Sequence, residues 1–439
     1  MKGMSDLTLV WRSLRARQLS SCVTVAMVMV AVALLLVLLS LREGAAQAFR
    51  RGTGNIHLLV SADASPLVGV LNGLFYANAP ANPIAWTKFE EIQESFPWKW
   101  AIPTQLGDSY LGSPVMATES EFLEEFEPVV GKPFRFAAGR VFAADFEVVV
   151  GAQAASEHGL TLGTKLVMSH GAGASHGGHE HGAHPYEVVG VLEPTGSAHD
   201  RALFTNLQST WIIHAEDRRE AGTGQDASAA ADHDGEAHDH AHVDAQDLTD
   251  ADKLITGILL RLPTRPGSDA SASLSSQLDR LRRDTSINVA QPAQQIGRLM
   301  AIVGDIDWLF VAMAAVVLLS SSVSIMLAMV ASMELRRRQV AILRVLGASA
   351  SRVFLLAITE STLIGAMGAL LGATLAVVGC EVASSLLAER IGLRISGTID
   401  LRSAVLVIAG AVVLAAIAGV IPAVKSYRTP VARHLRPLA

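Results

Sequence analysis

Histidine is concentrated in two stretches of this chain, and its spacing there is compatible with metal chemistry. Residues 170–184 read HGAGASHGGHEHGAH, and a second group of histidines stands among acidic residues within 216–252. Imidazole and carboxylate are side chains that bind Zn²⁺, with Cu²⁺ and Ni²⁺ as further options. The candidate metal ligands are His176, His179, His181, His184, His238, His240 and His242.

The same two stretches are low in sequence complexity, which gives a second interpretation. They offer few apolar side chains to bury, so we expect both to be solvated loops inserted between strands and unlikely to pack. Residues 216–252 hold twelve acidic residues and two arginines, whereas the whole chain has a net charge of −6. No ligand set is rigid enough to define one site. Loose zinc capture and a solvated insertion therefore both remain open, whereas His199 and His214, in folded segments, are expected to be structural.

Two short motifs could indicate catalysis, but each stands in the wrong context. Residues 173–177 fit the pattern G-x-S-x-G, yet they lie in a Gly- and His-rich loop and not at a strand-to-helix turn. Residues 159–165 contain Gly, Thr and Lys without the spacing of a phosphate-binding loop. We therefore expect a non-enzymatic protein with no catalytic residues and no intrinsic cofactor, and any ATP hydrolysis in a partner chain.

The composition of the chain argues against several further classes of protein. The two cysteines, Cys22 and Cys380, both lie in apolar runs, so neither a disulfide framework nor a thiolate metal site is expected. The chain has 439 residues, of which only 5% are aromatic, and no stretch combines basic and aromatic residues as nucleic-acid-binding segments do.

Four apolar runs are long enough to cross about 30 Å of hydrocarbon. The predicted transmembrane segments are 21–41, 308–333, 353–379 and 403–423. We expect the first of them to be a retained span and not a cleaved signal peptide, because its apolar core is longer than that of a signal peptide.

Lysine and arginine set the orientation of these spans. Basic residues gather in the amphipathic N-terminus 1–20, in the loop 334–352 and in the tail 424–439, which the positive-inside rule places in the cytoplasm. Residues 42–307 and the short loop 380–402 are then outside. This predicts a multi-pass membrane protein with both termini cytoplasmic and a large extracytoplasmic domain.

The outside region alternates strand and helix patterns. Strands are expected near 55–61, 111–117, 146–151, 186–192 and 256–262, and helices near 86–96, 119–126 and 271–283, with 291–307 as a stalk into the second span. The fold class is therefore a multi-pass α-helical membrane protein with four transmembrane helices and a large α+β extracytoplasmic domain.

The cytoplasmic loop between spans two and three has the pattern of a short amphipathic helix. Its sequence from Met333 is MELRRRQVAILRVLGAS, which places apolar residues on one side and a basic ridge on another. Gly347 provides a helix stop, and Ser349 or Ser351 can cap the start of span three. Such a helix suits the docking of a soluble cytoplasmic partner.

This loop resembles that of the FtsX/MacB-type ABC transporter permeases, which include the lipoprotein-release and macrolide-exporter-like permeases. Three further segments resemble the same family: 148–166 (VVVG, then GLTLGTKL), 186–204 (YEVVGVL, then DRALF), and the tail with IPA and PVARHLR. The likeness covers the spans, the loop, the tail and the outside scaffold. Gln339 stands where the family usually has Glu, and Thr164 where Asp is common.

The resemblance implies a complex of several chains in the bacterial inner membrane, with the large domain in the periplasm. A cytoplasmic ABC ATPase, expected as a separate chain because no fused ATPase is found, would bind the loop helix. A second permease copy or paralogue would complete a dimer, and a periplasmic adaptor or lipoprotein could join it. The coupling residues implied are Arg336, Arg338, Gln339, Leu343 and Gly347.

Span three contains small residues that permit close helix approach, namely Gly365, Gly368 and Gly372. This face could pack against a second subunit or within the chain, and the sequence leaves both possibilities open.

Three functional hypotheses follow. The first is an export or mechanotransmission permease acting on a lipoprotein, peptide or amphipathic substrate, and the large 42–307 region favours it. The second is an FtsX-like regulator of a periplasmic partner. The third is a zinc-responsive membrane factor that uses its His-rich loops.

Overall fold

The chain forms two compact units in a computed structural model. The structure describes residues 10, 12, 14–15, 18–170, 184–227, 243, 245–265, 267–335, 345, 349–391 and 399–427. The helical unit consists of residues up to 45 and from 302 onward, and the α+β unit consists mainly of residues 46–301.

The helical unit is built from four long helices. These are α2 (Gln18–Thr53), α9 (Pro292–Leu335), α11 (Ala350–Ile391) and α12 (Leu401–Tyr427). Each contains a segment long and apolar enough to cross a membrane: Gln18–Gly44, Trp308–Ala331, Ala350–Leu386 and Leu401–Lys425. Large apolar side chains such as Trp308, Leu319 and Leu406 are more than half exposed, as expected for surfaces that face lipid rather than water. The prediction of four membrane helices is confirmed.

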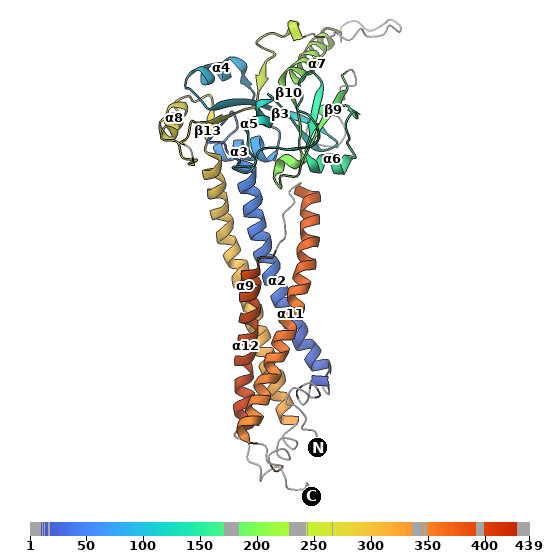
Figure 1. Cartoon of the computed structure of the whole chain (residues 1–439), viewed down its shortest axis with the longest axis vertical. Helices are drawn as coiled ribbons and strands as arrows, with labels where there is room; N and C mark the ends of the chain where they lie inside the picture. The colour runs from blue at the N-terminus through green and yellow to red at the C-terminus, as the bar shows by residue number, and fades with distance from the viewer. Residues whose placement is uncertain are drawn as a thin grey trace. The chain divides into compact units, whose positions relative to one another are not determined.

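The α+β unit contains one large mixed sheet of 11 strands, with the order β13-β1-β12-β3-β4-β10-β6-β9-β5. Figure 1 labels four strands of this sheet: β3, β9, β10 and β13. The strands along this path are β1 (Leu58–Ser61), β3 (Trp100–Tyr110), β4 (Ser113–Thr118), β5 (Phe136–Gly139), β6 (Glu147–Val150), β9 (Tyr186–Leu192), β10 (Leu203–Asn206), β12 (Gly257–Arg261) and β13 (Asn288–Ala290). Two short strands, β7 (Lys165–Leu166) and β8 (Ser169–His170), pair with β9 and β3. A separate pair is formed by β2 (Ile84–Ala85) and β11 (Leu254–Ile255).

Both faces of this sheet are buried. Leu59 and Ile102 belong to one apolar cluster, whereas their strand neighbours Leu58 and Ala101 belong to another, because successive side chains point to opposite faces. Helices supply the covering layers: α3 (Pro66–Phe75), α4 (Trp86–Glu94), α5 (Glu121–Glu125), α6 (Ala152–His158), α7 (Leu207–Ala227) and α8 (Leu274–Leu281). The short 3₁₀ turns are η1 (Ala198–Arg201) and η2 (Ala245–Asp247).

Strands from distant parts of the chain meet in this sheet. β1 pairs antiparallel with β12, so that Leu59 lies opposite Leu259, and β4 runs parallel to β10, so that Met116 lies opposite Phe204. The predicted strands 146–151, 186–192 and 256–262 correspond to β6, β9 and β12. The expected helices 86–96 and 271–283 correspond to α4 and α8.

The expectation that 216–252 forms an unpacked loop is wrong at both of its ends. Helix α7 continues through Glu216 to Ala227, and Val243 is buried against Ile212 and Ala215. Acidic residues favour solvation, but the Ala, Arg, Glu and Gln of this segment also favour helix, and Ile212 and Ala215 provide an apolar stripe on which Val243 packs. Of the first insert, residues 171–183 lie outside the described residues.

Candidate functional site

The chain leaves α2 and enters the sheet through Gly54 and Asn55. Gly54 has φ +50°, and a Cβ there would collide with the Phe126 ring and the Glu127 carbonyl oxygen, so glycine is required. The Asn55 side chain connects two parts of the α+β unit. Its Nδ2 donates to the Glu125 carbonyl oxygen at 3.1 Å, and its Oδ1 accepts from the Glu127 N–H at 3.2 Å. The end of α2 is therefore fixed to the loop that follows α5.

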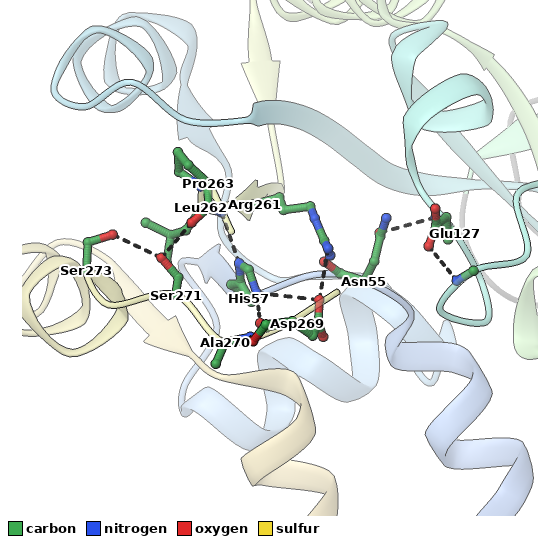
Figure 2. Close-up of polar contacts among 12 residues, drawn as sticks. Asn55, His57, Glu127, Arg261, Leu262, Pro263, Asp269, Ala270, Ser271 and Ser273 are labelled. Atoms are coloured by element: carbon green, nitrogen blue, oxygen red, sulfur yellow. Dashed lines mark hydrogen bonds and ion pairs between the residues drawn. The ribbon is translucent and has the colours of Figure 1, made fainter. Parts of the chain in front are cut away.

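Arg261, His57 and Asp269 fix the same connection to β12 (Figure 2). Arg261 donates to the Asn55 carbonyl oxygen and, at 2.8 Å, to Asp269 Oδ1. The Leu262 N–H donates to His57 Nδ1 at 3.0 Å, so the ring proton lies on Nε2, which donates to the Asp269 carbonyl oxygen at 2.9 Å. Arg261 and His57 are each only 8% exposed. We call Asn55, His57, Arg261 and Asp269 the joint.

The strands that meet the two long helices are direct neighbours. β1, which follows α2, pairs antiparallel with β13, which precedes α9; Leu59 lies opposite Ala290 and Ser61 opposite Asn288. α9 begins at Pro292, a residue well suited to the first turn of a helix. Phe49 of α2 and Ile296 of α9 pack on the same apolar cluster. Within the α+β unit, the end of α2 and the start of α9 are thus tied together by one strand pair and one core.

His199 is buried in the centre of that core. It is 1% exposed, its Nδ1 hydrogen bonds to the Tyr76 hydroxyl at 2.7 Å, and phenylalanine rings such as Phe122 and Phe126 surround it. Burial lowers the pKa of His199 from 6.5 to about 4 and raises the pKa of Tyr76. This position agrees with the structural role expected for His199.

Acidification is expected to destabilise the α+β unit through His199. The folded-state pKa lies below the unfolded one, so below pH 6.5 the unfolded chain binds a proton that the folded chain excludes until about pH 4. Stability should fall by up to about 1.4 kcal/mol per pH unit in that window. Urea unfolding of the full chain in detergent, followed by tryptophan fluorescence at pH 7, 6, 5 and 4, measures this slope. A His199→Leu variant with the same slope as the wild type would rule out His199 as the source.

The glycines of span three face other helices of the same chain. A Cβ on Gly368 would lie 2.6 Å from Val28 Cβ, and one on Gly372 would lie 2.7 Å from the Met29 carbonyl oxygen, both on α2. Gly365 faces Ala415 on α12. These glycines therefore permit close packing within the helical unit, which is one of the two alternatives that the sequence left open.

Of the seven candidate metal ligands, only His184 lies among the described residues. Its Nε2 is 3.0 Å from Glu216 Oε2, and its ring stacks on Phe146 at 4.7 Å. Glu216 also accepts the Val243 N–H at 2.9 Å. One carboxylate thus holds the residues that follow the segments 171–183 and 228–242. Within the described parts of the chain, no group of three His, Cys, Asp or Glu side chains could hold a metal ion.

The implied coupling residues cannot be placed. Arg336, Arg338, Gln339, Leu343 and Gly347 lie outside the described residues. The start of α11 is described, and there Ser349 Oγ accepts the Arg352 N–H at 3.2 Å, which is one of the two caps predicted.

Sequence reasoning did not single out the joint. The one available signal was a charged residue in an otherwise apolar strand, Arg261 in GILLRL. A charge at such a position requires a buried partner, but nothing in the sequence indicates that the partners are Asn55 and Asp269.

Two family models match most of the chain. Residues 21–256, more than half of it, match the MacB-like periplasmic core domain, and residues 311–431 match the FtsX-like permease C-terminal domain. The extracellular domain of the noncanonic ABC-type transporter YknZ from Gram-positive bacteria is a similar solved structure. It has 10% sequence identity and a TM-score of 0.27, and the match covers 53% of this chain and 98% of that one. A comparison with curated proteins gives no match.

The fold defines a multi-pass membrane protein whose first span is followed by one large mixed α/β domain. The chain belongs to the family of ABC-type transporter permeases with an FtsX-like C-terminal region and a MacB-like periplasmic core domain. The α+β unit is accordingly the extracytoplasmic domain. Permeases of this class are generally non-catalytic and work with a cytoplasmic ATPase.

Proposed function

We propose that this chain couples a separate cytoplasmic ATPase to movement of its extracytoplasmic domain, acting on a lipoprotein, peptide or amphipathic substrate. The observation that carries the proposal is the pairing of β1 with β13, because these strands continue from α2 and into α9. A displacement of either helix would act on one strand pair in a sheet buried on both faces. Tightly packed interiors transmit strain, so the domain would respond as a body and not by local fraying.

The joint supports this mechanism because it makes the connection after α2 stiff. A flexible linker would absorb a displacement of the helix before it reached the sheet. Here Asn55 is held by the loop after α5 and by Arg261 of β12, and His57 is held by the N–H of Leu262, which directly follows β12. We infer that the ATPase docks on the 334–352 loop, that both termini are cytoplasmic and that two permease chains form the working complex.

Co-purification from membranes in mild detergent tests the proposal. The wild type should bring down a stoichiometric ATPase, measured by mass spectrometry and by ATP hydrolysis. Arg338→Glu or Leu343→Asp should remove it, because each change places a wrong charge on the docking helix. Arg282→Glu, an exposed arginine of the extracytoplasmic domain, is the charge-matched control and should retain the ATPase.

A second candidate function is zinc capture by the His-rich segments. It is favoured by the contacts of Glu216, which hold the residues following both segments at one place and would let ligands from both share an ion. Metal analysis of the same preparation separates the two functions. A solitary permease with bound zinc and no ATPase would support zinc capture and contradict the coupling mechanism.

A further inference from the structure

Beside the end of α2, the extracytoplasmic domain has a cavity of about 520 Å³ with a basic lining. Arg51 from the last turn of α2, Lys132 from the turn after α5 and Arg135 before β5 contribute three cations, whereas Glu193 is the one acidic residue of the lining. A cavity of this volume is large enough for a small molecule or a headgroup. Its net charge favours an anion.

The three cations are not neutralised by the described residues around them. Their side chains make no ion pair there, and Glu193 alone leaves the lining with a net positive charge. Two other carboxylates of the neighbouring loops bind backbone N–H groups. Asp200 accepts the Thr195 and Gly196 N–H groups at 2.8 Å each, together with the Thr195 hydroxyl, and Glu127 accepts the Gly131 N–H at 2.7 Å. The positive charge of the cavity is therefore available to a ligand.

The head group of Arg51 lies close to the backbone of Gly196. A Cβ on Gly196 would lie 2.8 Å from an Arg51 guanidinium nitrogen, so the absence of a side chain at Gly196 makes room for this head group. Pro128, Pro133 and Pro194 stiffen the loops that line the cavity. Arginine binds phosphate oxygens by paired hydrogen bonds, and lysine is a second residue that commonly binds phosphate.

We propose that this cavity binds a phosphate group, from a phospholipid headgroup or from free phosphate. Arg51 lies ten residues after Leu41, the last residue of the first apolar run, and ten helical residues correspond to about 15 Å of chain. The helix that carries Arg51 is thus the same helix that forms the first span, which makes a lipid headgroup one candidate source of the phosphate. The inference stands independently of the proposed coupling to an ATPase.

Calorimetric titration of the full chain in a neutral detergent tests the inference. The two probes are inorganic phosphate and dihexanoyl phosphatidylglycerol below its micelle concentration. We expect one or both to bind, and Lys132→Glu/Arg135→Glu to weaken binding about tenfold or more, because two charge-assisted contacts become repulsive. Both residues are exposed, so the double variant should fold. Arg51→Ala should weaken binding in the same direction.

Lys99→Glu/Arg283→Glu is the matched control, since it makes the same change in net charge at two exposed positions outside the cavity. Its binding should equal that of the wild type. Binding of phosphatidylglycerol alone identifies a headgroup site, and equal binding of inorganic phosphate identifies a free-phosphate site. No binding of either probe, an equal loss in the control, or binding of a tetraglutamate peptide alone would overturn the proposal.

Discussion

Replacement of Gly368 by leucine should prevent the helical unit from packing. A Cβ at this position would already lie 2.6 Å from Val28 Cβ and 3.0 Å from the Val25 carbonyl oxygen, so α11 and α2 would have to separate. Overpacking of a tight contact costs about 1–3 kcal/mol, and more where backbone atoms must move. We expect a large loss of monodisperse protein in detergent, measured by size-exclusion chromatography and by the temperature of thermal aggregation.

Gly410→Leu is the matched control for this experiment. Gly410 lies in α12, and among the described residues no atom outside its own stretch of helix lies within 4 Å of a Cβ built there. The same substitution in a membrane helix should therefore leave yield and thermal stability close to those of the wild type. If both variants lost the same amount of monodisperse protein, the explanation that Gly368 is required by the close approach of α11 to α2 would be wrong.

The second large effect is expected for Arg261→Met in the joint. The change removes the donor to the Asn55 carbonyl oxygen and to Asp269, while a similar apolar volume remains. Loss of one partner from a buried charged network costs about 3–5 kcal/mol, but Asp269 is half exposed, so we expect about 2–3 kcal/mol here. Urea unfolding followed by tryptophan fluorescence measures it, since Arg261 lies opposite the buried Trp100.

Arg282→Met provides the comparison, because Arg282 is exposed at the end of α8. Its effect on the free energy of unfolding should be within about 0.5 kcal/mol. A loss for Arg261→Met as small as this would show that the joint does not contribute to the stability of the domain. The fluorescence change should also be cooperative, since Arg261 stands in a central strand of the sheet.

The membrane helices and most strands were predictable because their signals are local. A long charge-free run such as 21–41 indicates a membrane-spanning helix, because a helix satisfies its own backbone hydrogen bonds in lipid. The short β-branched run EVVV of β6 indicates a buried strand. The same patterns correctly predicted that α4 begins at Trp86 and β9 at Tyr186. The family resemblance rested on such segments, and the two family models match all of them except the end of the tail after residue 431.

The joint was not predictable, because its contacts are long-range. Asn55 and Arg261 are 206 residues apart, and their hydrogen bond depends on the pairing of β1 with β12. Glu216 shows a related difficulty. Its segment appears solvated by composition, yet its carboxylate binds His184 and the Val243 N–H from two other segments. The hydrogen-bond partners of such polar groups are determined by the tertiary structure and cannot be read from the sequence pattern.

Because β1 and β13 are neighbouring strands, the extracytoplasmic domain could be exchanged for another, in evolution or by engineering. The chain enters the extracytoplasmic domain at one strand and leaves it at the adjacent one, so the whole domain is a single module inserted into a helical hairpin. A domain whose two ends lie close together can be replaced without changing the path of the rest of the chain. A chimera that carries another domain with adjacent terminal strands between residues 57 and 291 should keep its spans, and specificity could diversify by grafting while the membrane helices stay the same.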